Sequence, residues 1–282
     1  MLEEKYMYRE KQDAINGLRN NESFESSIFH LFRNDKDVAL EAVSQDGWAL
    51  KYVDKRLWSD RDLVLAAVKK SGMVLRYVYD LFGGDREIVL NAVKQDGEAL
   101  KFASKSLKQD AEVVYEAVKF NSDSIRDADD IFRSCKKIMT EVVRKEGLLL
   151  FYADYNLKRD KEVVLLAVKQ NGISIKYADE SVRIDTEVAV EAVRQNYDVF
   201  RFMDEFNKSN KEIVLEALKL NYSSYDYAHK SIKKLCEGKD PIETLENLIR
   251  IERIEKNHLN LERKLEHKLN AVEDKPVRRM KI

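Results

Sequence analysis

The side chains that most often carry acid–base, nucleophilic or metal chemistry are few in this sequence and lie far apart. No two histidines share the spacing, to each other or to carboxylates, of a zinc-binding helix such as H-E-x-x-H. Cys135 and Cys236 have no metal-ligand spacing, which favours two reduced thiols in a reducing compartment. We therefore predict no catalytic residue, no metal site and no cofactor. The histidines are His30, His229, His258 and His267.

Two further segments have the composition of a site. Gly83-Gly84 is rich enough in glycine for a phosphate loop, but no strand is predicted before it and no Lys-Ser or Lys-Thr follows, so we interpret it as a turn. The acidic residues Asp123, Asp127, Asp129 and Asp130 crowd together and are the one candidate for a pocket of perturbed titratable groups. Drift from a repeating pattern is the alternative explanation for them.

Basic residues recur every 25 positions in two series. Stacked along one edge, either series would form a ladder able to neutralise phosphates of RNA or DNA. The alternative is an ordinary solvated helix surface, because glutamates precede many members of the first series by three residues. The first series is Lys69, Lys94, Lys119, Arg144, Lys169, Arg194 and Lys219. The second series is Lys51, Arg76, Lys101, Arg126, Lys176 and Arg201. In the fifth repeat Phe151 occupies the position of this series.

Large aromatic residues outside the repeating apolar positions are candidate anchors for a protein partner. Together with Asp127, Asp129 and Asp130 they form our predicted partner-binding set, although packing in the core or at an edge would explain each one alone. These aromatic residues are Trp48, Trp58, Tyr79, Phe120 and Tyr155.

The elements that must position these residues come from a 25-residue repeat without insertion or deletion between residues 35 and 234. Six of its eight copies begin with Asp, and Cys135 and Asn210 occupy the first position of the other two. Seven residues later comes Ala, or Val142 in one copy, and the next residue is Val, or Leu218 in one copy. One such unit cannot bury its apolar face alone, so we predict an all-α solenoid of stacked two-helix repeats. The units start at residues 35, 60, 85, 110, 135, 160, 185 and 210.

The unit that starts at Asp160 shows how the sequence encodes its helices. Asp160 is a suitable N-cap, and Glu162 places negative charge in the first turn. Gly172 is predicted to end the first helix as a left-handed C-cap. A second, shorter helix is predicted from the spacing of Ile175, Ala178 and Val182.

The ends of the chain differ from the repeats. Residues 1–34 are predicted to be N-terminal helices with a degenerate capping repeat, in which Ala14, Ile15 and Leu18 match core positions. Residues 235–282 are predicted to be a linker, a long helix from about 241 to 272 and a basic tail at Val277–Ile282. The leucines of this helix do not hold a sustained heptad, which argues against a strong coiled coil but leaves a dimer contact or a docking arm open.

The repeated pattern, as in Asp160-Lys-Glu-Val-Val-Leu-Leu-Ala-Val-Lys-Gln-Asn-Gly172 followed by Ile175-Lys-Tyr-Ala-Asp179, resembles a helical-repeat family. That family is catalogued as domain of unknown function 4116 and is common in bacteria and some protists. The likeness covers about residues 35–234. It implies an interaction module and supplies no catalytic residues.

Charge and hydropathy restrict the function further. The 50 basic and 51 acidic residues give a pI of about 6.5, so net charge does not favour a polyanion partner. Without a signal-peptide-like or membrane-spanning apolar run, we expect a soluble, cytoplasmic protein. The leading hypothesis is a non-enzymatic protein-binding scaffold, including an effector or inhibitor that occupies a partner's surface. The alternative is binding of RNA or DNA through the basic ladders.

Overall fold

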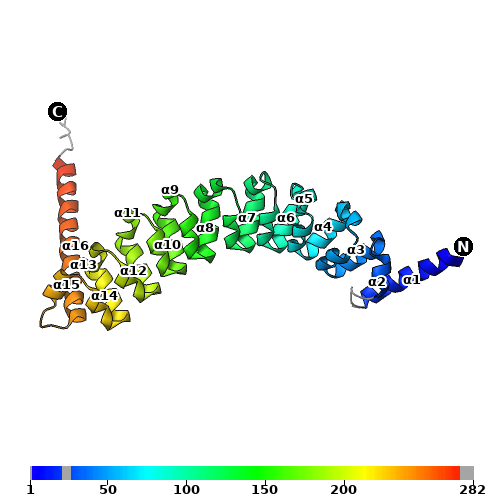
Figure 1. Ribbon diagram of the computed structural model, residues 1–282. Coiled ribbons are helices and arrows are strands. Elements are labelled where there is room, and N and C mark those ends of the chain that lie inside the picture. The colour runs from blue at the N-terminus through cyan, green and yellow to red at the C-terminus, as the bar shows by residue number, and fades with distance from the viewer. Residues whose placement is uncertain (1, 21–26, 274–282) are drawn as a thin grey trace, which may run out of the picture. The chain divides into compact units, whose positions relative to one another are not determined.

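The computed structural model describes residues 2–20 and 27–273, and every regular element within these ranges is helical (Figure 1). Each repeat begins with an α-helix of ten residues, and these helices pack on one another in chain order within each compact part of the molecule. The predicted all-α solenoid is therefore confirmed. The first helices are α3 (Lys36–Gln45), α4 (Arg61–Lys70), α6 (Arg86–Gln95), α7 (Ala111–Phe120), α8 (Lys136–Lys145), α10 (Lys161–Gln170), α12 (Thr186–Gln195) and α14 (Lys211–Leu220).

The predicted caps start these helices. The Asp85 carboxylate accepts hydrogen bonds from the backbone N–H groups of Glu87 and Ile88 at 3.0 and 3.1 Å, which satisfies two of the donors left free at a helix start. The other aspartates of the series and Asn210 cap in the same way, whereas Cys135 makes no side-chain cap bond. The apolar stripe of each helix is buried, and removal of this surface from water stabilises the stack.

The second half of each repeat consists of two short helical pieces where the sequence pattern predicted one helix. In the sixth repeat, Ala178 between the pieces is extended, with φ −69° and ψ 155°. This opening frees the next N–H, of Asp179, to donate to the carbonyl of Lys158 in the preceding repeat at 3.0 Å. Equivalent bonds join other neighbouring repeats, such as Asp154 to Arg133 and Asp129 to Lys108. The second half of the repeat is thus not one continuous helix, and a backbone hydrogen bond to the preceding repeat takes the place of a bond within the helix.

The bounds of these pieces are as follows. The first pieces are η1 (Gly47–Tyr52), η3 (Gly72–Tyr77), η4 (Gly97–Phe102), η6 (Ser122–Arg126), η8 (Gly147–Tyr152), η9 (Gly172–Tyr177), η10 (Tyr197–Phe202) and η11 (Tyr222–Tyr227). The second pieces are η2 (Lys55–Ser59), α5 (Tyr79–Phe82), η5 (Leu107–Gln109), η7 (Asp130–Ser134), α9 (Tyr155–Lys158), α11 (Glu180–Arg183), α13 (Glu205–Ser209) and α15 (Lys230–Leu235).

The prediction of left-handed glycine caps at the ends of the first helices is wrong. The helix end at Asn171 is extended, with φ −152°, and Gly238 is the one glycine of the described chain with a positive φ, 71°. The repeat glycines are instead needed for space. A Cβ on Gly72 would clash with the Ala92 carbonyl oxygen in the next repeat, because the two atoms would be closer than van der Waals contact. Gly47, Gly97 and Gly147 meet the next repeat in the same way.

Ion pairs between neighbouring repeats form a series that the sequence analysis did not identify. Arg61, at the first position of α4, contacts the next cap Asp85 at 2.7 Å and the first-turn acid Glu87 at 2.6 Å. Where the cap is not aspartate, the residue 24 positions earlier is not basic: Ala111 precedes Cys135, and Thr186 precedes Asn210. Asn210 there donates to the Thr186 hydroxyl at 2.9 Å. The equivalent cations are Lys11, Lys36, Arg86 and Lys136.

These pairs predict a specific acid sensitivity. Hydrogen bonds from Arg61 and Arg86 lower the pKa of Asp85 and Asp110 below the ordinary value of 3.8. A lowered folded-state pKa contributes stability that is present above pH 4 and is lost as the pH falls through the folded pKa. Thermal unfolding should therefore shift to lower temperature below about pH 4. In a D85N/D110N variant, asparagine keeps the cap, as Asn210 does, and this shift should become smaller. Melting curves at a series of pH values measure it, and an unchanged shift would contradict the ion-pair origin.

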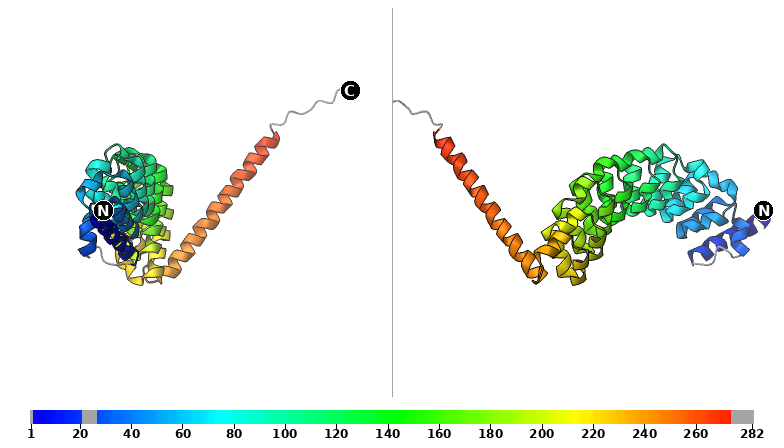
Figure 2. Two further views of the ribbon diagram at one scale, coloured as in Figure 1. Left: turned by 90° about the vertical axis from the view of Figure 1, so that its right-hand side faces the viewer. Right: turned by 60° about the vertical axis from the view of Figure 1, so that its left-hand side comes forward.

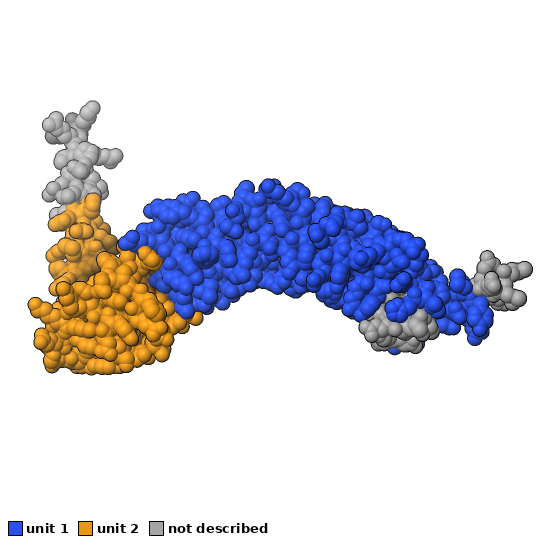
Figure 3. All heavy atoms as spheres, in the orientation of Figure 1, with its two compact units in different colours: residues 1–182 blue, residues 183–282 orange. Residues whose placement is uncertain are grey.

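By its internal contacts the described chain divides into two compact units, Met1–Val182 and Arg183–Ile282 (Figure 3). In the first, α1 (Leu2–Arg19) packs on α3 through the buried Ala14, Ile15 and Leu18, and α2 (Ser27–Phe32) follows it. The boundaries predicted from the sequence, at residues 34 and 234, follow the repeats and stay a prediction.

In the second unit, α16 (Pro241–Glu273) packs against α14 and then continues as a single helix (Figure 2). Leu245 is completely buried there. The predicted basic tail, Val277–Ile282, lies outside the described residues.

Candidate functional site

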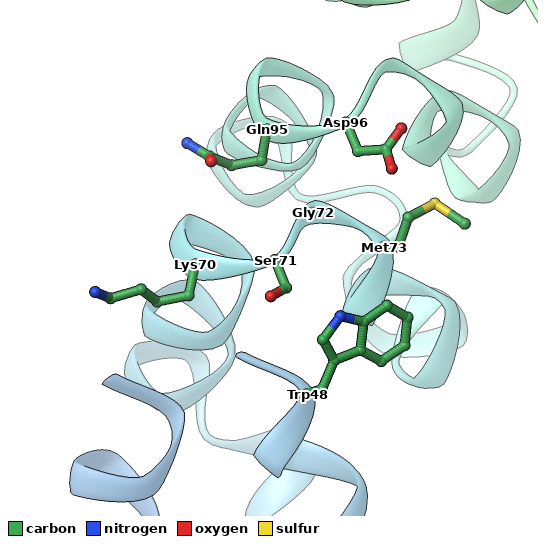
Figure 4. Close-up of a pocket in the computed structure, with 7 residues that line it drawn as sticks. All are labelled: Trp48, Lys70, Ser71, Gly72, Met73, Gln95 and Asp96. Carbon is green, nitrogen blue, oxygen red and sulfur yellow. The ribbon is translucent and has the colours of Figure 1, made fainter. Parts of the chain in front are cut away.

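A cavity between the second and third repeats does not assemble catalytic groups. It has a volume of about 180 Å³, and its polar side chains diverge: Lys70 and Gln95 point away from the side on which Trp48, Met73 and Asp96 lie (Figure 4). Asp96 caps η4 by accepting from the Glu98 N–H. The full lining is Trp48, Lys70, Ser71, Gly72, Met73, Gln95 and Asp96.

The candidate residues for acid–base and metal chemistry have structural partners. His229 accepts a hydrogen bond from the Ser231 N–H and so caps α15, and His258 lies 3.3 Å from Glu262 on α16. Cys236 is buried, and this burial raises the pKa of its thiol. Within residues 2–20 and 27–273, no group of three His, Cys, Asp or Glu side chains could hold a metal ion. None of the described helices is both long and apolar enough to cross a bilayer.

The structure does not bring the predicted acidic residues together as one site. Asp129 caps η7 and accepts a hydrogen bond from the Gln109 amide at 2.8 Å. Asp130 pairs with Arg133 at 3.1 Å, and Asp127 follows the last turn of η6. Each carboxylate therefore has its own local position and its own local partner or cap.

The predicted aromatic anchors fall into two groups. Trp48 and Trp58 are half-buried against Tyr77 of the next repeat, at ring distances of 6.1 and 6.0 Å, so they join two repeats. Tyr79, Phe120 and Tyr155 are exposed, by 49 %, 57 % and 61 % of their surfaces. The exposed three remain candidates for binding, and Tyr155 lies four residues after the exposed Phe151.

Both basic ladders are largely occupied by partners within the chain. In the first, Arg144 pairs with Glu141 at 3.2 Å and Arg194 with Glu216 at 2.9 Å. In the second, most cations lie over the aromatic ring that follows them in sequence, at 4.3 to 5.8 Å from its centre. These pairs are Lys51–Tyr52, Arg76–Tyr77, Lys101–Phe102, Lys176–Tyr177 and Arg201–Phe202.

The fifth repeat interrupts this second ladder with an aromatic residue. Phe151 occupies the ladder position of its repeat and is 55 % exposed. Its ring meets Tyr152 edge-on at 5.2 Å and Tyr177 of the next repeat at 5.4 Å. Tyr155, four residues along the chain, adds a second exposed ring. We call Phe151, Tyr152, Tyr155 and Tyr177 the aromatic cluster.

Basic side chains surround the aromatic cluster. Arg126 has no aromatic residue beside it in its own repeat, because Asp127 stands there, and it lies 5.5 Å from the Tyr152 ring instead, as does Arg133. The Lys158 ammonium group donates to the Phe151 carbonyl at 2.8 Å, and the Arg159 guanidinium donates to the Tyr155 hydroxyl at 3.2 Å. These cations hold the rings in defined positions before a partner binds. Less side-chain conformational entropy is then lost on binding.

Sequence reasoning placed Tyr155 in the site and missed the rest of the aromatic cluster. Tyr152 and Tyr177 match the aromatic position of the ordinary repeat, so nothing in the sequence distinguished them from packing residues. Phe151 was visible as a departure from the basic series. Arg133, Lys158 and Arg159 could be assigned only once the folded repeats brought them over these rings.

Comparison with known proteins agrees with the repeat pattern. The pattern of the family described as Domain of unknown function (DUF4116) matches residues 18–82, 85–133, 135–183, 160–207 and 185–233. No curated protein and no solved structure matches the chain. The last four matches start 50, 25 and 25 residues apart, which are whole numbers of repeats. Because the matches together cover more than half of the sequence, the chain belongs to the DUF4116 family of helical repeats.

Proposed function

We propose that this protein is a protein-binding scaffold without catalytic activity of its own, and that it acts by occupying a partner's surface through the aromatic cluster. The observation that carries the proposal is the exposed Phe151 ring, held edge-on between Tyr152 and Tyr177 at a position that is basic in most other repeats. Protein interfaces concentrate binding energy in aromatic and arginine side chains of this kind.

The charges around the cluster favour a protein over a polyanion. Arg126 pairs with Asp123 at 2.7 Å, Arg133 with Asp130 at 3.1 Å, and Arg159 is 3.7 Å from Asp179. These arginines are already neutralised by neighbouring carboxylates, so a phosphate chain would have to compete with them. An apolar side chain of a protein partner can instead contact the rings, and its backbone can contact the polar groups around them, while the ion pairs stay in place.

Single-stranded nucleic acid along the second ladder is the alternative. It is favoured by the alternation of cation and ring in the first three repeats, for example Lys51 with Tyr52 and Arg76 with Tyr77, since bases stack on aromatic groups. The two functions predict different partners, and nuclease treatment separates them.

Truncation of Phe151 to alanine should weaken partner binding by about thirtyfold, the effect of losing a hot-spot side chain worth about 2 kcal/mol. The tagged protein is first used to capture partners from a lysate of its native host, with and without nuclease, and the purified partner is then titrated calorimetrically. F206A is the matched control, because Phe206 is equally exposed, by 57 %, and lies outside both the cluster and the predicted partner-binding set.

Equal affinity of F151A and the wild type would contradict the aromatic cluster as the contact surface. Loss of every partner after nuclease treatment would replace the protein-binding proposal with the nucleic-acid alternative, and the substitutions R76A and K101A would then be expected to reduce the salt dependence of binding.

A further inference from the structure

The distal part of α16 is a helix without a packing partner in the described chain. Its first turns are held on the last repeat by the buried Leu245 and by ion pairs, Lys219–Glu246 at 2.6 Å and Lys211–Glu252 at 2.6 Å. From residue 251 to residue 268 every side chain is exposed, and Figure 2 shows this segment as a single helix beyond the repeats of its unit. At 1.5 Å per residue it is about 27 Å long.

An apolar stripe runs along this segment with alternating spacings of three and four residues. Ile251, Ile254, His258, Leu261 and Leu265 are its members, which corresponds to positions a, d, a, d and a of a heptad. The leucines of this helix alone do not form a sustained heptad. Isoleucines supply the first turns of the stripe, and Leu259 lies outside it.

The residues beside the stripe indicate what covers it. The g positions are Arg250, Asn257 and Lys264, and the e positions within the exposed segment are Glu255 and Glu262. In a parallel pair of identical helices each g residue faces the e residue five positions later on the partner, so Arg250 meets Glu255 and Asn257 meets Glu262. In an antiparallel pair e faces e and g faces g, which would oppose like charges.

We propose that the distal part of α16 pairs with the same segment of a second copy of this chain, as a parallel, in-register two-stranded coiled coil. The single stripe gives one self-complementary contact, as a two-fold symmetric dimer requires. His258 at an a position would fix the register, as a polar residue at this position does in short coiled coils. The dimer would present two repeat arrays at once and so raise avidity for a partner that offers repeated sites. The proposal does not depend on what the arrays bind.

The test is sedimentation of the full-length chain over a concentration range from about 1 to 200 µM. We expect a reversible monomer–dimer equilibrium for the wild type, and at least about tenfold weaker association for L261K, because a lysine would be buried at a d position. L259K is the matched control: it makes the same change on the same helix, two residues away, at an exposed position outside the stripe, and it should dimerise like the wild type. Thermal unfolding of both variants should match the wild type, because Leu259 and Leu261 are 48 % and 61 % exposed and neither belongs to the buried core.

A second variant tests the orientation. E255Q/E262Q removes attraction from a parallel pair and repulsion from an antiparallel pair, so we expect its dissociation constant to rise a few-fold. A fall in that constant would overturn the parallel arrangement. A wild type that stays monomeric at the highest concentration, or equal effects of L259K and L261K, would overturn the dimer itself.

Discussion

Replacement of Gly72 by alanine is expected to lower the free energy of unfolding by about 2–3 kcal/mol, the cost of forcing an extra carbon into a filled contact. The added Cβ would press on the Ala92 carbonyl oxygen and would lie only 3.0 Å from its carbon and 3.1 Å from the Asp96 nitrogen. All three atoms belong to the backbone of the next repeat, so no flexible side chain can move aside. Denaturant unfolding monitored by circular dichroism measures the loss.

The matched control for this change is G84A. Gly84 has nothing within 4 Å of an added Cβ and does not have a positive φ, so alanine there should be neutral or slightly stabilising. If both substitutions had the same small effect, the contact between repeats would not be the reason for glycine at this position. A left-handed cap would predict a penalty at Gly72 of about 1–2 kcal/mol, so a loss above this range supports the close contact between repeats.

Deletion of one complete 25-residue repeat, from the middle of α4 to the equivalent position of α6, is expected to leave a folded protein. Removal of residues 66–90 joins Leu65 to Asn91 and creates one hybrid repeat that keeps the 25-residue register. Arg61 would then face Asp110 and Glu112, as Arg86 does now, and Trp58 would face Phe102 in place of Tyr77. The variant should melt cooperatively at a somewhat lower temperature, because one interface between repeats is lost.

Deletion of one residue fewer, 66–89, should be severely destabilising. It rotates the second half of the hybrid helix by about 100° relative to the first half. Asn91 would then occupy the fully buried position that belongs to Ala67 or Ala92, at a cost of several kcal/mol for an amide without partners in a close-packed site. Comparison of the two melting curves checks the prediction, and similar stability of both deletions would contradict a repeat in strict register.

Local rules were enough to predict the elements of this fold. The 25-residue interval, the aspartate caps and the four apolar positions per helix each act within one or two helical turns, and all appear in the structure as expected. The family followed from the same pattern. The ion pairs between repeats were also readable, since Ala111 and Thr186 depart from the basic series 24 residues before the two caps that are not aspartate. That signal needed only the assumption that neighbouring repeats touch.

Other features were decided by the packing of repeats on one another. A glycine at position 72 is consistent both with a left-handed helix cap and with close contact between two repeats. Only the position of the Ala92 carbonyl in the next repeat distinguishes these two explanations. Tyr152 and Tyr177 look like ordinary repeat positions, yet the ring of Phe151 between them makes an exposed surface. The sequence alone determined the repeat, its caps and its core, because these depend on spacing along one helix. The tertiary structure decided which residues share a surface, because that depends on contacts between repeats 25 residues apart.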